Sequence, residues 1–518
     1  MLRIGIDVGG THTDAVLLDG RDVVATTKAT TSADVLTGIV DALDNVLAER
    51  PGSEKNIDAV MLGTTQFTNA VVERRELTEV AAVRLGAPSG DGLPPKTGWP
   101  DDIARALGDQ AYMLKGGTLF DGHPLAAFDE QEVQRLIDDL IAKRSEAICV
   151  SAVFSPVDPR PEQLLGEKIK AALPNAEVTL SHSIGRLGLL ERENAALLNA
   201  SLLPFADRVV TACVAAIRGR GLTCQFFISQ NDGTLMDADF ARRFPALTFA
   251  SGPTNSLRGA ASLTGLDNAI VIDIGGTTSD IGVLQDGFPR ESNLVIEVGG
   301  VRTNFRMPDI LALGLGGGSV VSADGVEIGP QSVGHRLLDE AMVFGGDTLT
   351  ASDVVVAAGA ATIGDPTRVQ SLSVDVIATA QQQIQGMLER GVETMKPSSD
   401  PLPVVLVGGG AILASETLAA AASIHRPDYA NVANAIGAAI AQIGGESEQI
   451  VSYDKIDRDK ALASVRQEAA RVAIDAGVDA ATLRVADVEE TPIAYMAGNA
   501  VRLRVKVVGD VAIQAGPR

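Results

Sequence analysis

Two stretches of the sequence share one pattern, and this repeat limits the possible folds more than any other feature. Residues 4–14 read IGIDVGGTHTD, and residues 271–280 read VIDIGGTTSD. Both follow the order apolar-Asp-apolar-Gly-Gly-Thr-x-(Thr/Ser)-Asp. In each, an apolar run typical of a strand ends at an aspartate and a glycine turn follows. Because the two stretches stand half a chain length apart, the repeat predicts two related halves that face one ligand.

The first glycine turn lies between two predicted strands. Residues 2–8 are apolar, residues 11–18 resume as a second strand, and residues 23–30 can form a third after the Asp19-Gly20 turn signal. A G-x-G-x-x-G dinucleotide loop or a G-x-x-x-x-G-K-[ST] loop would open a helix instead, and neither motif is present here. The sequence therefore predicts a strand–turn–strand loop.

Such loops can hold ATP and Mg²⁺. Glycine has no Cβ, so backbone N–H groups can approach a phosphate closely, and neighbouring threonine hydroxyls add donors. Asp7 and Asp273, at strand ends, are the candidate catalytic and Mg²⁺-binding residues. A third glycine turn follows the strand at 403–407 and offers bare backbone to a base or ribose. The candidate cofactor-binding residues are Gly9, Gly10, Thr11, Thr13, Gly275, Gly276, Thr277, Thr278, Gly408, Gly409 and Gly410.

A single Gly-Gly-Thr turn is usually just a tight hairpin. Two of them with the same flanking aspartates, followed by a third glycine turn, favour a nucleotide site.

Strand-like and helical segments alternate along most of the chain, which predicts an α/β fold with parallel strand pairs. The strand at 147–154, for example, lies between helical patterns at 129–144 and 161–172. After about residue 447 the pattern changes to a charged helix, 458–476, and then to strands within 482–514. We expect three parts: 1–187, 188–447 beginning with a connecting helix, and a small α+β appendage at 448–518.

The bulk composition excludes several classes of protein. A chain of 518 residues is too long for one core. Its net charge of −23 argues against nucleic acid or an anionic membrane as a partner. The three cysteines have no metal-type spacing and suggest no disulfide framework. With no signal-like N-terminus and no membrane-length apolar run, we expect a cytoplasmic protein.

The ordered glycine turns resemble the phosphate-1, phosphate-2 and adenosine motifs of the actin-like ATPase and sugar kinase superfamily. Further stretches resemble the A subunit of the hydantoinase/oxoprolinase family, and the similarity covers about residues 2–445. These stretches are Gly63-Thr64-Thr65-x-x-Thr68-Asn69-Ala70, Glu191-Arg192 with Asn199-Ala200, Gln230 to Gly233, Ser251-Gly252-Pro253 with Gly259-Ala260, and Asp309 with Gly316 to Ser319. The resemblance implies two ribonuclease-H-like, actin-like domains around a nucleotide cleft.

The resemblance also implies an activity: ATP-dependent ring opening of a cyclic amide such as a hydantoin, 5-oxoproline or a related lactam. ATP would phosphorylate the amide oxygen, and the activated carbon would then be hydrolysed with the help of a B-type hydrolase subunit. Glu191 matches the family pattern and is a third candidate catalytic residue, although a solvated helix face would explain it equally well. A homo-oligomer is also compatible with the sequence.

Two other functions stay open: a small-molecule kinase of the same fold, and a nucleotide-switched ATPase that acts on a partner enzyme. His12 stands where the family usually has an aromatic or apolar residue. It has one of two roles: contact with substrate or phosphate, or a structural role in the turn. Asp232 is either a carboxylate near the cleft or a turn residue. The remaining histidines, His123, His182, His335 and His425, lack ligand-type partners in the sequence, so we expect no zinc site.

Overall fold

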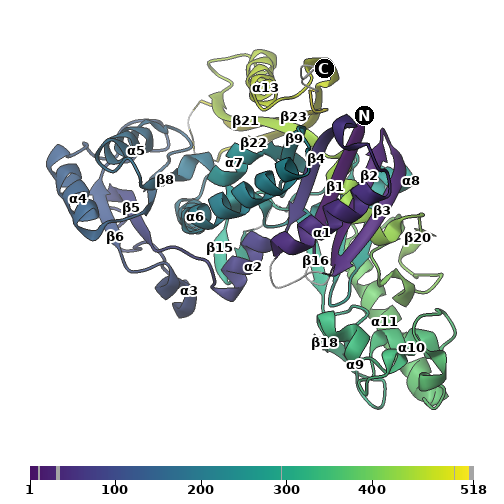
Figure 1. Cartoon of the computed structure of the whole chain (residues 1–518). Coiled ribbons are helices and arrows are strands. Elements are labelled where there is room, and N and C mark those ends of the chain that lie inside the picture. Colours follow the sequence, from purple (N-terminus) through teal and green to yellow (C-terminus); the bar gives the residue numbers. More distant parts are fainter. Residues whose placement is uncertain (10–11, 31–34, 293–294, 495, 497, 513–518) are drawn as a thin grey trace.

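The computed structural model describes residues 1–9, 12–30, 35–292, 295–494, 496 and 498–512 of the chain. Its strands form two large mixed sheets and a smaller third sheet. In Figure 1 the third sheet, with β5 and β6, lies at the left, and the second large sheet leads to the helices at the lower right.

The first sheet has the strand order β22-β23-β21-β10-β9-β4-β1-β2-β3. Its strands are β1 (Leu2–Val8), β2 (His12–Asp19), β3 (Asp22–Thr30), β4 (Ile57–Thr64), β9 (Gln225–Ser229), β10 (Thr234–Asp237), β21 (Gln442–Ser452), β22 (Arg484–Pro492) and β23 (Ala500–Gly509). Strand β1 is antiparallel to β2 and parallel to β4, which is parallel to β9. The predicted strand–turn–strand arrangement at the N-terminus is therefore confirmed.

The second sheet repeats this arrangement. Its order is β13-β12-β11-β19-β20, with β16 also paired to β12. The strands are β11 (Ala269–Ile274), β12 (Ser279–Gln285), β13 (Phe288–Pro289), β16 (Ile310–Leu313), β19 (Leu402–Val407) and β20 (Ala421–His425). Strand β11 is antiparallel to β12 and parallel to β19, which is parallel to β20. Five strands of each sheet share one order and one set of directions, β3-β2-β1-β4-β9 in the first and β13-β12-β11-β19-β20 in the second. This agreement confirms the predicted α/β class, two ribonuclease-H-like domains of the actin-like ATPase fold.

Strand pairing does not follow the boundaries at 187/188 and 447/448. Strands β9 and β10 lie beyond the first boundary, yet they belong to the first sheet. The C-terminal strands β21 to β23 extend the same sheet through the parallel pair of β10 and β21. Pairing between strands far apart in the chain leaves no local signal in the sequence. The three-part division therefore stays a prediction, and the C-terminal strands are continuous with the first sheet.

The third sheet, β6-β5-β7-β8, is entirely parallel. Its strands are β5 (Val80–Ala87), β6 (Ala111–Lys115), β7 (Ala147–Ala152) and β8 (Glu177–Leu180), with α4 (Glu130–Lys143) and α5 (Arg160–Ala172) in the crossovers. Helix α4 shows why these segments are helical. Asp129 caps its first turn by accepting from the N–H groups of Gln131 and Glu132, and four apolar residues at helical spacing, Val133, Leu136, Ile137 and Leu140, are buried.

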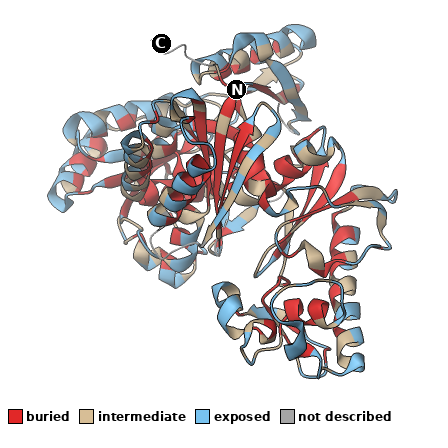
Figure 2. Cartoon of the chain, turned by 45° about the vertical axis from the view of Figure 1, so that its right-hand side comes forward, coloured by how far each residue is buried: buried red, intermediate tan, exposed pale blue. Residues whose placement is uncertain are grey.

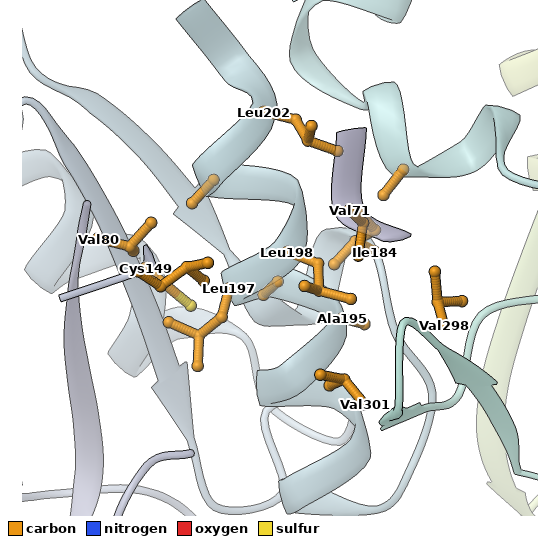
Figure 3. Close-up of a cluster of buried hydrophobic side chains, with 14 of the residues drawn as sticks. Val71, Val80, Cys149, Ile184, Ala195, Leu197, Leu198, Leu202, Val298 and Val301 are labelled. Carbon is orange, nitrogen blue, oxygen red and sulfur yellow. The ribbon is translucent and has the colours of Figure 1, made fainter. Parts of the chain in front are cut away.

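Helix α6 (Leu189–Gly219) is the longest element. Figure 3 shows its Leu197, Leu198 and Leu202 within a buried cluster that also contains Cys149 of β7. By length and hydropathy alone α6 could cross a membrane, a test that core helices of globular domains also pass. Here it carries Glu193, which is buried and accepts from Arg84 Nε at 2.7 Å and from Ser151 Oγ at 2.6 Å.

Two helices pack against each other between the large sheets. Helix α8 (Ser251–Thr264) packs on β11, β12 and β19, and α12 (Ala433–Ile440) packs on β1, β2 and β4. Their backbones approach very closely: a Cβ on Gly259 would lie 1.9 Å from the carbonyl oxygen of Ala433, and one on Gly437 would lie 1.8 Å from that of Asn255. Figure 2 shows the buried strands on both sides of this junction.

The other helices cover the sheets or form the lobe at the lower right of Figure 1. They are α1 (Val35–Ala48), α2 (Gln66–Glu73), α3 (Asp101–Ala106), α7 (Ala238–Arg243), α9 (Leu337–Glu340), α10 (Ala351–Ala357), α11 (Val374–Met395) and α13 (Arg458–Asp475). Two small hairpins complete the fold: β14 (Ile296–Val298) with β15 (Val301–Thr303), and β17 (Ser319–Val321) with β18 (Ile328–Ser332).

Candidate functional site

The two repeated stretches form matching hairpins. Asp7 lies opposite Asp14 across β1 and β2, and Asp273 lies opposite Asp280 across β11 and β12. Each turn closes with the same backbone hydrogen bond, which the first glycine donates. Gly9 N–H donates to the His12 carbonyl at 3.0 Å, and Gly275 N–H donates to the Thr278 carbonyl at 2.9 Å. The repeat in the sequence is thus a repeat in structure.

Asp7 is buried and receives one amide donor on each carboxylate oxygen. Asn255 Nδ2 of α8 donates to Oδ1 at 3.1 Å, and Asn434 Nδ2 of α12 donates to Oδ2 at 3.0 Å. Burial raises the pKa of Asp7 to about 6, and the charges of Asp14 and Asp273 also raise it, while the amide donors lower it. The two amides therefore fix the position of the Asp7 carboxylate, while burial and the neighbouring carboxylates make its negative charge unfavourable.

Asp273 is held by the residue that follows Asn255. Ser256 Oγ of α8 donates to Asp273 Oδ2. Burial raises the pKa of Asp273, and burial together with the charge of Asp273 raises the pKa of Asp280 to about 7. One helix thus positions an aspartate from each sheet.

Each of the two aspartates also lies against a glycine at the end of the neighbouring parallel strand. A Cβ on Gly63, near the end of β4, would lie 2.2 Å from Asp7 Oδ1. A Cβ on Gly408, after β19, would lie 2.3 Å from Asp273 Oδ1. Any side chain at either position would displace the carboxylate, so glycine is required for packing there.

The dense glycine loop before β17 supports the second turn. Gly317 N–H donates to the Gly275 carbonyl at 3.0 Å, and Gly318 N–H donates to the Gly276 carbonyl at 2.7 Å. The carbonyls of the turn are therefore occupied. In the described part of the chain no group accepts from the N–H of Gly276 or Thr277, and the Thr277 and Thr278 side chains are exposed. Donors at this turn are free for an anion.

The third glycine turn has one open position. Gly408 N–H donates to the Ala430 carbonyl at 2.9 Å, and Gly410 N–H donates to the Ile274 carbonyl at 2.7 Å. Both residues are closely packed. Gly409 is exposed, and a Cβ there would meet nothing within 4 Å. Its role in binding adenosine stays a prediction, but the space that this role requires is present.

The first turn is described only in part. Gly10 and Thr11 lie outside the described residues. Thr13 is buried within β2, so its hydroxyl does not face solvent. His12 is half-buried, and burial and the charge of Lys28 lower its pKa while Asp14 raises it. Lys28 Nζ lies 3.1 Å from Asp14 Oδ1, which gives the turn one cation.

Glu191 lies apart from these groups. It is in the first turn of α6, and the cation nearest to it is Arg302, at 3.7 Å. None of the contacts described for Glu191 joins it to Asp7 or Asp273, so its catalytic role stays a prediction.

The residues around the two aspartates fit a Mg²⁺ ion. Asp7, Asp14 and Asp273 repel one another electrostatically, and Asn255 Oδ1 is buried without a hydrogen-bond partner. Mg²⁺ takes oxygen ligands and usually keeps several waters, with one or two carboxylates and the phosphates of its substrate. The described residues contain no cluster of three or more His, Cys, Asp or Glu side chains that could hold a metal ion by themselves.

Sequence reasoning missed the groups that hold the aspartates. Asn255 and Ser256 stand in a stretch of small and polar residues, SGPTNSLRG, that predicts only a helix. Asn434 stands in an alanine-rich helix, and Gly63 was seen only as part of a family-like stretch. The polarity of Asn255 and Asn434 inside otherwise small-residue helices was the available signal, because buried amides need partners.

Most of the chain matches known proteins. Residues 3–173 match the family described as hydantoinase/oxoprolinase N-terminal region, and residues 192–365 match hydantoinase/oxoprolinase. The chain is 27% identical over 390 residues to the caprolactamase subunit alpha of Pseudomonas jessenii, covering 69% of this chain and 54% of that protein. It is also 27% identical over 394 residues to the acetophenone carboxylase gamma subunit of Aromatoleum aromaticum, covering 68% and 53%. The chain thus spans about half the length of these relatives.

Two solved structures share the fold. The ATP-dependent caprolactamase of Pseudomonas jessenii superposes with a TM-score of 0.76 at 19% identity, covering 99% of this chain and 88% of that chain. A nucleotide-free acetone carboxylase superposes with a TM-score of 0.67 at 18% identity and the same coverage. The two matched regions, which together span most of the chain, identify this protein as a member of the hydantoinase/oxoprolinase family.

Proposed function

We propose that this chain is the ATP-binding part of an enzyme that activates a small carbonyl compound by phosphorylation, with a cyclic amide as the leading substrate. The observation that carries the proposal is the shared support of Asp7 and Asp273. Consecutive residues of α8 hold these aspartates, which come from different sheets and lie beside glycine turns. Such a pair suits a polyphosphate and its metal ion better than it suits a structural hairpin.

In the proposed site, the free N–H groups of Gly276 and Thr277 bind phosphate oxygens, and Gly409 provides the open backbone beside the adenosine. Asp7 and Asp273 hold Mg²⁺, directly or through water. The ion, when bound, neutralises the charge that develops on the phosphates. The residues themselves bind and orient the nucleotide, which is the main task in phosphoryl transfer.

The proposed reaction balances as follows. The amide oxygen bonds to the γ-phosphorus while the bond to the bridging oxygen of ADP breaks. Water then adds to the activated carbon, the ring C–N bond breaks and the nitrogen takes a proton. A second water releases phosphate from the acyl phosphate. The sum is lactam, ATP and two waters giving an amino acid, ADP and phosphate.

A related substrate class has support of its own. One relative is named for a lactam and another for an aromatic ketone, at equal identity to this chain. Phosphorylation of a carbonyl oxygen would activate either compound. A partner is also proposed, because both relatives are named as subunits. The B-type hydrolase subunit, a homo-oligomer and a cytoplasmic location stay predictions.

The test measures ADP release with hydantoin, 5-oxoproline, caprolactam or acetophenone plus bicarbonate, with and without the product of a neighbouring B-type gene. We expect one carbonyl compound to stimulate turnover, and mass spectrometry to detect the opened ring or the carboxylated ketone. A stable phosphoester would instead indicate a kinase. Stimulation by the protein partner alone would indicate a nucleotide switch.

Variants of the two aspartates test the site itself. Asp7→Asn and Asp273→Asn should each lower turnover by about 100-fold or more, the usual effect of removing a group that stabilises transition-state charge. Asp41→Asn, at an exposed position of α1, is the control. Unchanged turnover in both site variants would refute the proposal.

A further inference from the structure

A cavity of about 450 Å³ is lined by residues outside the two aspartate turns. Its walls come from the loop at 182–187 before α6, from residues 230–234 beside β10, and from β21 at 444–450. None of its lining residues belongs to 4–14, 271–280 or 408–410. Its volume lies within the usual range for small-molecule sites, and the proposed ATP site does not use it.

One wall of this cavity contains a histidine with a buried carboxylate behind it. Glu162, in the first turn of α5, is fully buried and accepts four hydrogen bonds. Ala152 N–H at 2.8 Å and Ser181 Oγ at 2.6 Å donate to Oε1. His182 N–H at 3.0 Å and His182 Nδ1 at 2.7 Å donate to Oε2. A carboxylate surrounded only by donors is ionised.

This arrangement fixes the state of the imidazole ring. Burial raises the pKa of Glu162, but the hydrogen bonds from His182 and from the hydroxyls of Ser155 and Ser181 bring it below its ordinary value. Because Nδ1 must carry a hydrogen to reach Glu162, Nε2 is the nitrogen left for the cavity. The His182 side chain is 17% exposed and lines the cavity.

The charges in the cavity are already paired. Lys506 Nζ lies 2.8 Å from Asp232 Oδ2, and Arg306 pairs with Glu446 and, at 3.8 Å, with Glu448. A cavity with balanced charge does not attract a polyanion such as a nucleotide. Ile184 and Leu247 add apolar surface beside these pairs. The lining therefore favours a compact uncharged molecule with a polar group directed at His182.

We propose that this cavity binds a cyclic compound with an amide or imide N–H, and that His182 Nε2 accepts the hydrogen of that group. The ligand N–H bond stays intact in this contact, which is a hydrogen bond, and the Glu162 carboxylate holds the imidazole ring through Nδ1. Glu162 is a positioning residue because it acts through His182. Only the choice of ligand class rests on the proposed function.

Nitrogen-15 NMR tests this directly, because the chain has only 5 histidines. The full chain labelled at histidine should show His182 as the Nδ1–H tautomer. Adding hydantoin or caprolactam should shift its Nε2 resonance by several ppm and leave that of the exposed His123 unchanged. His182→Asn keeps a donor for Glu162 but lacks Nε2, so it should fold normally and bind hydantoin about tenfold more weakly. The same variant assigns the resonance.

Two results would overturn the inference: an Nε2–H tautomer at His182, or no shift with either compound. The tautomer of His182 in Glu162→Gln is a second measurement, which a purely structural role of Glu162 would not change. The glutamine amide would donate to Nδ1, so the ring hydrogen should move to Nε2. If that variant does not fold, His182→Asn still decides the question. Titration of the same sample with ATP and Mg²⁺ reports on the aspartate site. Loss of nucleotide binding with a retained hydantoin shift would therefore refute the proposed function alone.

Discussion

Asn255 and Ser256 are consecutive residues of α8, yet the first binds Asp7 of one sheet and the second binds Asp273 of the other. Neighbouring side chains on a helix diverge by roughly 100°, so a helix between two sheets can serve both at once. The spacing of the two aspartates is thereby set by one short piece of backbone.

This relationship predicts a specific pattern of coupling. Asn255→Ala removes a donor from a buried carboxylate, so it should lower the free energy of unfolding by about 2 kcal/mol, and Ser256→Ala should act similarly. The two losses should not add fully in urea unfolding, because the residues are adjacent on one helix and the charges of Asp7 and Asp273 repel each other. They should not add in ATP affinity, because both aspartates serve one ligand. Ser262→Ala, exposed on the same helix, is the control. Additive losses of ATP affinity would show that the two aspartates act independently.

The crossing of α8 and α12 should not tolerate a methyl group. In Gly437→Ala the new Cβ would lie 1.8 Å from the Asn255 carbonyl, so the helices must separate, at a cost of about 3 kcal/mol or more. Gly386→Ala in α11 meets only the flexible end of Arg390, at 3.1 Å, and should stabilise the protein by about 0.5–1 kcal/mol. Thermal unfolding of both variants measures the contrast. Equal changes in melting temperature for the two variants would show that the backbones of α8 and α12 are not in close contact.

A side chain at Gly409 should weaken nucleotide binding and leave the stability of the fold unchanged. Its Cβ position is open, so Gly409→Leu should leave the melting temperature unchanged. If adenosine packs there, ATP affinity measured by calorimetry should fall about tenfold or more. Gly92→Leu, another open and exposed position, is the matched control and should leave affinity unchanged. Unchanged ATP affinity in Gly409→Leu would show that adenosine does not pack against this turn.

Acid should weaken the contact that Glu291 makes with the C-terminal strand. Burial raises the pKa of Glu291, but the charges of Lys506, Arg306 and Arg504 outweigh burial and lower it to about 2, from 4.5. A folded pKa below the unfolded value stabilises the protein fully above pH 4.5, and this stabilisation is lost as pH falls toward 2. The shift corresponds to about 3 kcal/mol.

Glu291→Gln tests this linkage. Urea unfolding should show a deficit of a few kcal/mol relative to the wild type at neutral pH, shrinking in strong acid as the wild type loses the same interaction. Glu297→Gln, exposed in β14, should show no deficit at any pH. A deficit in Glu291→Gln that stays constant with pH would mean that packing, and not charge, explains it.

The sequence predicted the features that adjacent residues determine and missed the contacts between distant parts of the chain. The hairpins at Asp7 and Asp273 follow from adjacent strand and turn signals, so they were predicted correctly. The two partners of Asp7, Asn255 and Asn434, stand 248 and 427 residues away in the chain, and no periodicity connects them to Asp7. Ser256 stands only 17 residues before Asp273, but no local pattern directs its side chain to that aspartate. The pairing of β10 with β21 was missed for the same reason. Glu162 lies beside the His182 ring only once β7, α5 and β8 have folded together.

The close approach of Gly259 and Gly437 to opposing carbonyl groups has a mechanical consequence. Where backbones touch without intervening side chains, helices cannot slide past each other without severe overlap. Relative movement of the two sheets is then restricted to rotation about the contact, as at a pivot. Points near a pivot move least, so the support of Asp7 and Asp273 on α8 would keep their separation while the outer edges of the two halves swing.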